Sequence, residues 1–196
     1  MSEITFNRCH WVDLTKADYV QYHDEEWGEP VYDDKKMFEF VVLESAQAGL
    51  SWYTILKRRA NYRAAFAQFD VEQVARFDQQ KVESLMQDSG IIRNRAKINA
   101  TISNAQAFIK IQQEFGSFSD YLWAYFNHQP MVNLPKCKSD YQATSDISDS
   151  ISKDLKKRGF KFFGSTICYA HLQACGLIND HSADCFKSAL KKVNTP

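Results

Sequence analysis

Two cysteines and two histidines near the ends of the chain have the side-chain types, and the number, that a zinc ion prefers. His181 and Cys185 lie four positions apart in "NDHSADC", and Cys9 and His23 lie near the N-terminus. A structural zinc site is closed by four protein ligands, so one pair from each end would form a Cys2His2 site that joins the two ends. Spacing alone leaves His10 as an alternative to His23. It also allows all of these residues to be ordinary surface and core side chains.

The other cysteines and histidines are expected to be structural. Cys168 and Cys175 lie seven positions apart on an expected helix, which is typical of buried core thiols. His128 and His171 are expected to be structural or surface side chains. The chain has five cysteines, an odd number, and its N-terminal segment has no apolar signal core, so we expect free thiols or metal ligands and a cytoplasmic location.

A single carboxylate in an apolar stretch is the best candidate for chemistry. Glu44 is the only charged residue between Phe40 and Leu56, and on a helix it would project from a mainly apolar face. An unpaired buried carboxylate is costly, so such residues tend to be kept for chemistry or for binding a cation. The alternatives are a salt bridge to a distant arginine and exposure at the end of the helix.

Aromatic residues are concentrated near this carboxylate in the sequence. They are Trp11, Tyr19, Tyr22, Trp27, Trp52 and Tyr53. Tyr19, Tyr22 and His23 share one helical face because they are spaced by three and four positions. Aromatic faces and one carboxylate would suit a flat cationic or electron-poor ring, bound by stacking, cation–π attraction and a hydrogen bond, although some of these rings must fill the core.

A basic turn could bind a phosphate backbone. The stretch "SKDLKKRGFKFFGST" contains five basic residues and one acid, and Gly159 and Gly164 flank its tight turn. Two helices joined by such a turn would point free backbone N–H groups outward, beside the positive N-terminus of the second helix. Arg93, Arg95 and Lys97 could extend this patch, although basic runs are usually solvated surface.

The elements that would position these residues are expected to be almost entirely α-helical, because glycine and proline are few and apolar residues recur at three and four positions. Helices are expected at 33–50, 51–69, 79–90, 94–116, 119–126, 148–159 and 165–176, with a loop at 133–148. Asp33, Ser51 and Ser119 are expected to begin helices, and Gly90 and Gly116 to end them.

Length and composition predict one soluble domain over residues 1–196. The chain is 44% hydrophobic, with 24 basic and 24 acidic residues, so a nucleic-acid surface would have to be a local patch. No apolar run approaches the roughly 18 residues of a membrane span, so we expect no membrane partner. A monomer is expected.

Several motifs of this sequence, and their order along the chain, resemble those of the DNA-3-methyladenine glycosylase I family, within the helix-hairpin-helix glycosylase superfamily. They include "RCHWV", "YHDEEWGEP", "LESAQAGLSWYTILKRR", "GIIRNRAKI", "FNHQP" and "KKRGFKFFGSTICYAHLQACGLINDH". The resemblance implies an all-α fold with a helix-hairpin-helix unit at about 149–176, and an enzyme that excises 3-methyladenine from alkylated double-stranded DNA and releases the free base. Because such a cationic base leaves readily, no Schiff-base lysine is needed, and we expect a monofunctional enzyme that does not cleave the strand.

The resemblance also implies roles for individual residues. One structural zinc ion would be bound by Cys9, His23, His181 and Cys185. Glu44 would be the key carboxylate, Tyr22 and Trp52 would contact the base, and Trp11 and Tyr19 would line the same pocket. The hairpin residues Gly159, Phe160, Lys161 and Gly164 would contact DNA. Much of the superfamily has a catalytic aspartate after the second hairpin helix, but this family lacks it, so Asp180 is interpreted as structural.

Two further expectations concern function. Gly49 and Leu50 lie between the Glu44 helix and Trp52, so they are candidates for the group that wedges into the DNA stack. Two alternatives remain for the whole chain. One is a non-catalytic protein of the same fold that binds alkylation damage, and the other is a zinc-clamped helical protein whose pocket holds a small cationic metabolite.

Overall fold

The computed structural model describes residues 6–188, and the ends of the expected 1–196 domain lie outside the described residues. The α-helices are α1 (Ala17–Glu25), α2 (Asp34–Gln47), α3 (Trp52–Leu56), α4 (Arg59–Ala65), α5 (Val71–Ala75), α6 (Gln79–Gln87), α7 (Arg95–Phe115), α8 (Phe118–Ala124), α9 (Asp146–Arg158) and α10 (Ser165–Ala174). Two 3-10 turns are η1 (Ala67–Phe69) and η2 (Lys138–Asp140), and two short strands are β1 (Met131–Val132) and β2 (Ile178–Asn179). The expectation of a mostly helical fold is confirmed.

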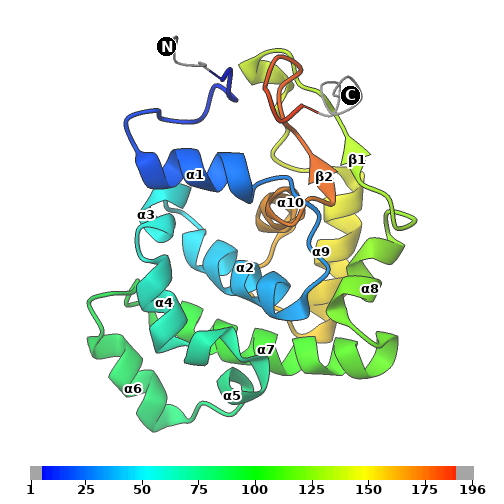
Figure 1. Ribbon diagram of the computed structural model, residues 1–196. Helices are drawn as coiled ribbons and strands as arrows, with labels where there is room; N and C mark the ends of the chain where they lie inside the picture. Colours follow the sequence, from blue (N-terminus) through cyan, green and yellow to red (C-terminus); the bar gives the residue numbers. More distant parts are fainter. Residues whose placement is uncertain (1–5, 189–196) are drawn as a thin grey trace.

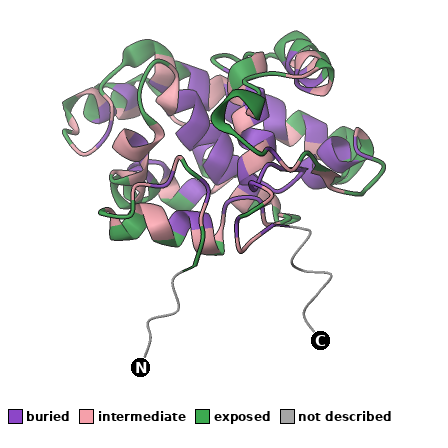
Figure 2. Ribbon diagram, turned by 90° about the horizontal axis from the view of Figure 1, so that it is seen from above, coloured by how far each residue is buried: buried purple, intermediate pink, exposed green. Residues whose placement is uncertain are grey.

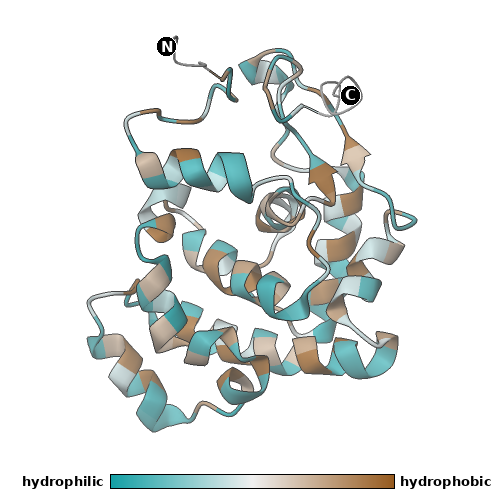
Figure 3. Cartoon of the chain, viewed as in Figure 1, coloured by the Kyte–Doolittle hydropathy of each residue, from teal (hydrophilic) through white to brown (hydrophobic). Residues whose placement is uncertain are grey.

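Helix α2 is the central element of the fold. Its residues from Met37 to Ala46 are all buried, and it packs against α3, α7, α8 and α10. Figure 1 shows α2 in the middle of the molecule, with α1 above it, α7 below it and α10 beside it. Buried residues gather around this centre in Figure 2, and Figure 3 shows hydrophobic residues interspersed with hydrophilic ones along the surrounding helices. Glu44 therefore lies within a continuously buried stretch of the central helix.

Several helix ends follow the sequence signals. The Asp33 carboxylate accepts a hydrogen bond from the Lys36 N–H at 2.7 Å, and the Ser51 hydroxyl accepts one from the Thr54 N–H at 3.2 Å. Such caps satisfy N–H groups that have no partner within the helix. Helix α7 ends at Gly116, whose φ of 90° suits glycine. The structure thus confirms the expected starts of α2 and α3 and the expected end of α7.

The expected helix 51–69 is wrong, because the chain breaks into α3, α4 and η1. At the first break, the Arg58 guanidinium donates to the carbonyl of Thr54 at 3.0 Å and so satisfies a carbonyl that the break leaves free. The direction of α4 is set by Arg59, which forms ion pairs of 2.7 and 2.8 Å with Glu26 and Glu39. These contacts join segments that are distant in the sequence, so the spacing of apolar residues within 51–69 cannot predict them.

Two other expected helix ends are also wrong. Helix α8 is capped by Ser117, whose hydroxyl accepts from the Asp120 N–H at 2.8 Å, while the Ser119 N–H donates to Asp34 instead. Helix α6 ends at Gln87, before Gly90. A Cβ at Gly90 would lie 2.9 Å from the side chain of Asn61, so this glycine allows a close approach between segments and does not end a helix.

A short pair of parallel strands was not expected. Met131 pairs with Ile178 and Val132 with Asn179. The pair joins the loop after α8 to the segment after α10, which leads on to His181. Within residues 6–188, no helix has both the length and the apolar character needed to cross a membrane.

Candidate functional site

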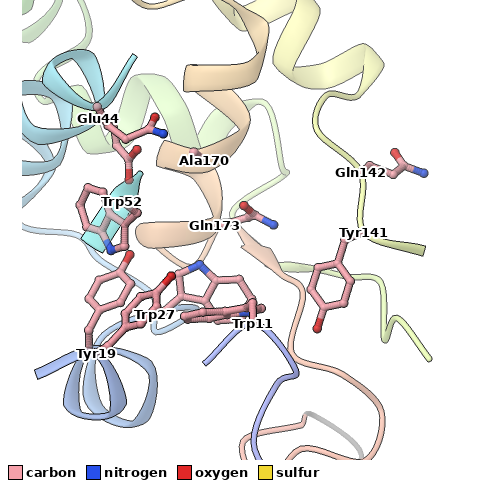
Figure 4. Close-up of a pocket in the computed structure, with 11 residues that line it drawn as sticks. Trp11, Tyr19, Trp27, Glu44, Trp52, Tyr141, Gln142, Ala170 and Gln173 are labelled. Carbon is pink, nitrogen blue, oxygen red and sulfur yellow. The ribbon is translucent and has the colours of Figure 1, made fainter. Parts of the chain in front are cut away.

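A pocket of about 300 Å³ lies between α1, α2, α3, α10 and the loop that leads into α9. Its lining residues are Trp11, Tyr19, Tyr22, Trp27, Glu44, Gln47, Trp52, Tyr141, Gln142, Ala170 and Gln173. The structure therefore brings together Glu44 and all four aromatic residues expected to surround it. Figure 4 shows the carboxylate at one end of a wall of rings.

Glu44 is a buried carboxylate without a partner. Its exposed fraction is 4%, and no hydrogen bond or ion pair to it is present among residues 6–188. Burial raises the pKa of Glu44 to about 8, because a charged carboxylate loses its hydration in this environment. The alternative of a salt bridge to a distant arginine is not realised here, since Arg59 pairs with Glu26 and Glu39.

Two N–H groups of the aromatic wall are left without a partner among the described residues. The rings of Trp11 and Tyr19 lie 5.3 Å apart between centroids, as do those of Tyr22 and Trp52. The indole N–H groups of Trp11 and Trp52 are buried, and neither has a hydrogen-bond partner within residues 6–188. A buried donor without a partner is costly, so a ligand that accepts hydrogen bonds here would be stabilised.

Five lining residues were not singled out from the sequence as binding residues. Gln47 lies three positions after Glu44 on α2, and this helical spacing could have identified it. Tyr141 and Gln142 come from the loop before α9, and Ala170 and Gln173 come from α10. Nothing local in these segments indicates a pocket, because only the tertiary fold places them opposite α2.

Asp180 is held by three hydrogen bonds. It accepts from the Asn133 amide at 2.7 Å, the Tyr169 hydroxyl at 2.8 Å and the Gln173 amide at 2.7 Å. The residue is buried, and it does not line the pocket. These contacts agree with a structural role, in which Asp180 fixes the amide of Gln173 at the wall of the pocket.

Three of the four expected metal ligands form a buried cluster. Ligand atoms of Cys9, His23 and Cys185 all lie within 4.8 Å of one another. A hydrogen bond from the Cys185 thiol and, more weakly, one from the Ser182 N–H lower the pKa of Cys9. A cysteine that ionises readily is suited to a metal, because the thiolate is the ligand form.

The ring of His23 is oriented by a carboxylate. Its Nδ1 lies 2.7 Å from Asp24 Oδ1, and Arg8 in turn donates to Asp24 at 2.8 and 2.6 Å. A carboxylate on one ring nitrogen turns the other nitrogen, Nε2, towards the cluster as an electron-pair donor. This arrangement is typical of histidines that bind metals.

His181 lies beside the cluster, and His10 does not belong to it. The ring centroid of His181 is 5.1 Å from that of His23, and its Nδ1 lies 3.0 Å from the Asn179 side-chain oxygen. Its buried Nε2 has no hydrogen-bond partner in the described part of the chain. His10 is exposed and stacks edge-on against Tyr141. The donor atoms therefore fit a closed metal site with His181 better than one with His10.

The cluster and the pocket share a wall. Trp11 contacts His23 at a centroid distance of 5.3 Å, and Trp27 contacts His181 at 4.7 Å. Both tryptophans also line the pocket. A metal at the cluster would therefore stabilise the residues that shape the pocket.

Helices α9 and α10 are joined by the glycine-flanked turn expected from the sequence. Gly159 ends α9 in the left-handed conformation with a φ of 108°, and Gly164 caps α10. Among the described residues, nothing accepts a hydrogen bond from the backbone N–H groups of Phe162, Phe163 and Gly164. A groove beside this turn also contains Lys153, Lys156 and Lys161. Free N–H groups and lysines together make an anion-binding surface.

Two details of the expected basic surface are wrong. The side chain of Phe160 is buried, at 4% exposure, and Phe162 is the exposed aromatic of the turn, at 42%. Arg95 pairs with Glu83, and the Lys97 ammonium donates to two backbone carbonyls, so neither extends the patch as a free cation. The sequence shows which residues are basic, but it does not show which of them already have an ion-pair or hydrogen-bond partner in the fold.

The Gly49–Leu50 turn lies beside the pocket, between the lining residues Gln47 and Trp52. Gly49 has a φ of 80°, and a Cβ there would meet no atom within 4 Å. Leu50 is a large apolar side chain that is 37% exposed.

Comparison with known proteins identifies the family. A family model described as methyladenine glycosylase matches residues 11–188. The chain is 52% identical over 178 residues to DNA-3-methyladenine glycosylase 1 of Escherichia coli (strain K12), covering 91% of this chain and 95% of that protein. It also matches a crystal structure of a 3-methyladenine DNA glycosylase I, with a TM-score of 0.90, 48% identity and coverage of 93% of this chain and 100% of the other.

A second structure shows a relative with a ligand. It is a point variant of a 3-methyladenine DNA glycosylase I in complex with 3-methyladenine, with a TM-score of 0.88 and 40% identity, and it covers 91% of this chain and 96% of the other. Both the sequence and the structural matches extend over nearly the whole length of each protein. This chain therefore belongs to the methyladenine glycosylase family.

Proposed function

We propose that this protein hydrolyses the N-glycosidic bond of 3-methyladenine in alkylated double-stranded DNA, as a base-excision-repair glycosylase. The observation that carries this proposal is the buried carboxylate of Glu44, which has no partner among residues 6–188 and faces a pocket walled by aromatic rings. The names of the relatives and the complex with 3-methyladenine support the same substrate.

The substrate explains why so small a catalytic apparatus is sufficient. An adenine methylated at N3 is positively charged in DNA and leaves as a neutral base, so its glycosidic bond is already weak and needs little help from a general acid. The protein must instead extrude the base from the duplex, at a cost of a few kcal/mol, and select it. Trp52 and Tyr22 would contact the extruded ring, and Trp11 and Tyr19 would close the pocket around it.

Glu44 would recognise the cationic base. Its carboxylate would accept a hydrogen bond from the exocyclic amine, and its negative charge would favour both the cationic base and the positive charge that develops on the sugar. The free enzyme resists ionisation of this group, since burial raises the pKa of Glu44 to about 8. A cationic ligand favours the ionised form, so charge complementarity would add to the selection of alkylated bases.

The second substrate would be water. None of the residues that line the pocket is a lysine, so no amine is available there to form a Schiff base with the sugar. We therefore propose a monofunctional enzyme that releases the base without cleaving the strand. A covalent adduct with DNA trapped by borohydride would contradict this.

DNA would be bound by the helix-hairpin-helix unit at about 149–176. The free N–H groups of Phe162, Phe163 and Gly164 would donate hydrogen bonds to a phosphate, and Lys161 would add a positive charge beside it. Gly159 would permit the tight turn, and the buried ring of Phe160 would hold the hairpin on the core. Such contacts would supply affinity that depends on salt but not on sequence.

A zinc ion would be structural. Cys9, His23 and Cys185 would bind it, with the free Nε2 of His181 as the fourth ligand. Four protein ligands leave no open position for water, so zinc would add stability by tying the N-terminal segment to the segment after α10. Base release would then depend on zinc only through the integrity of the fold.

The test is to incubate the purified protein with methylated duplex DNA and to identify the released bases by chromatography. We expect free 3-methyladenine and little 7-methylguanine. Tight, salt-dependent binding without base release would indicate a damage-binding protein of the same fold. Binding of small cationic rings without affinity for duplex DNA would indicate a metabolite-binding protein.

A further inference from the structure

Lys97 is a cation bound by the backbone of another helix. It lies in the first turn of α7, and its ammonium donates to the carbonyl oxygen of Ala46 at 2.8 Å and to that of Ala48 at 2.6 Å. No carboxylate pairs with Lys97 in the described part of the chain, and partial burial lowers its pKa. Its partners are therefore the last carbonyls of α2 and of the turn after it.

The C-terminal end of α2 needs such a partner. The last four carbonyls of a helix have no partner within it, and this end carries partial negative charge. Helix α2 has no basic residue in its own last turn. A lysine from α7 thus supplies both the hydrogen bonds and the charge that the sequence of α2 lacks.

The carbonyls that Lys97 binds lead directly into the turn between the pocket residues Gln47 and Trp52. After Ala48 the chain turns sharply through Gly49, and the Gln47 amide and the Leu50 backbone N–H add two hydrogen bonds across this turn, each of 2.6 Å. Gln47 lines the pocket, and Leu50 is the exposed apolar side chain beside it. When a base leaves the duplex for the pocket, an apolar group in this place would fill the gap left in the stack.

We propose that Lys97 is a positioning residue for base extrusion, because it holds the Gly49–Leu50 turn in the conformation that presents Leu50 to the duplex. This inference rests on the proposed glycosylase function and extends it to a residue outside the pocket. Glu44 lies earlier on α2, within the part of the helix that packing already fixes, so the effect of Lys97 falls on extrusion and not on recognition of the free base.

The test compares Lys97→Met, which keeps the apolar stem and loses the charge and the donors, with Lys97→Arg, which retains both. Lys110→Met is the matched control, because Lys110 is an exposed lysine on the same helix and far along it from the turn. Single-turnover base release is measured on methylated duplex DNA and on the same DNA after strand separation. Affinity for free 3-methyladenine is measured by quenching of tryptophan fluorescence.

We expect Lys97→Met to slow release from duplex DNA at least about tenfold, the scale expected for a small misplacement of a working group, with a much smaller loss on single strands. Affinity for free 3-methyladenine should stay within about twofold of wild type, because the pocket itself is unchanged. Lys97→Arg should retain most of the duplex activity, and Lys110→Met all of it. Combining Lys97→Met with Leu50→Ala should add little to either single effect, because both act on one turn.

Three results would overturn the inference. If Lys97→Met slowed base release equally on duplex and single-stranded DNA and also bound free 3-methyladenine more weakly, Lys97 would only support the fold of the pocket. If Lys97→Met reduced the slope of log affinity for duplex DNA against log salt by about one charge, Lys97 would contact a phosphate instead. Unchanged duplex activity would mean that it has no role. If wild-type protein released no base from either form of DNA, the proposed function itself would fail, and that result is distinct from these three.

Discussion

The Sγ atom of Cys185 lies 3.5 Å from Nε2 of His23, although 162 positions separate the two residues. Cys9 joins them, and the three side chains are buried. The segment before α1 is thereby fixed to the segment after α10, and α1 carries Tyr19 and Tyr22 into the pocket. The construction of the pocket therefore depends on contacts between the two ends of the described chain.

Cys185→Ser should remove bound zinc and lower the melting temperature by about 10 °C or more, because a closed metal site contributes several kcal/mol to folding. Metal content by mass spectrometry and thermal unfolding would test this. Cys137→Ser is the control, since Cys137 is exposed and lies outside the cluster. Protein that remains folded should still release base. A variant with full zinc content and unchanged stability would contradict the assignment.

Glu44→Gln should stabilise the protein without ligand, and increasingly so as the pH rises. The folded pKa of Glu44, about 8, lies above the roughly 4.3 of an unfolded glutamate. The protonated Glu44 contributes its full stability below the pKa of the unfolded state. That stability is lost as the pH rises through the pKa of the folded state. The advantage of the glutamine variant should therefore grow by a few kcal/mol between about pH 5 and pH 8. Urea unfolding of both proteins at the two pH values tests this, and a constant difference would refute it.

Lys161→Gln should weaken binding to duplex DNA and reduce the slope of log affinity against log salt by about one charge. The reason is that Lys161 lies beside the free N–H groups of the hairpin and has no carboxylate partner among residues 6–188. Affinity for free 3-methyladenine should not change. Lys110→Gln, on the opposite end of α7 from the pocket, should leave the slope as it is. An unchanged slope for Lys161→Gln would remove the hairpin lysine from the DNA surface.

Asp180→Asn should cost about 1–3 kcal/mol in stability and leave base release within about threefold of wild type. The carboxylate accepts hydrogen bonds from three side chains, and an asparagine at this position would place a donor against donors. Chemical denaturation and single-turnover kinetics measure the two effects. A loss of release by orders of magnitude with unchanged stability would instead mean that Asp180 is a catalytic aspartate.

The elements with local signals could be predicted from the sequence, and those set by distant contacts could not. Asp33, Ser51 and Gly116 act through their own helix, so their roles follow from the adjacent residues. The break between α3 and α4 depends on the ion pairs of Arg59 with Glu26, just after α1, and with Glu39 of α2. A periodic apolar pattern continues through such a break and therefore predicts one helix.

The same distinction applies to the site. Glu44 could be found because a lone charge in an apolar helix has few structural uses, and the aromatic residues near it because they lie in two short segments. Gln173 and Tyr141 enter the pocket only because α10 and the loop before α9 fold against α2. Lys97 was grouped with the basic patch because a sequence shows its charge and not the carbonyls that it binds.

The most direct test of the central claim is the rate of 3-methyladenine release from methylated duplex DNA by wild type, Glu44→Gln and Ser45→Ala. Ser45 is the matched control, because it is the buried neighbour of Glu44 on α2 and does not line the pocket. We expect Glu44→Gln to fold and to bind duplex DNA normally while release slows by about 10² or more, and Ser45→Ala to release base at nearly the wild-type rate. Release by Glu44→Gln at the wild-type rate would contradict the account, because the pocket would then select and release its base without this carboxylate.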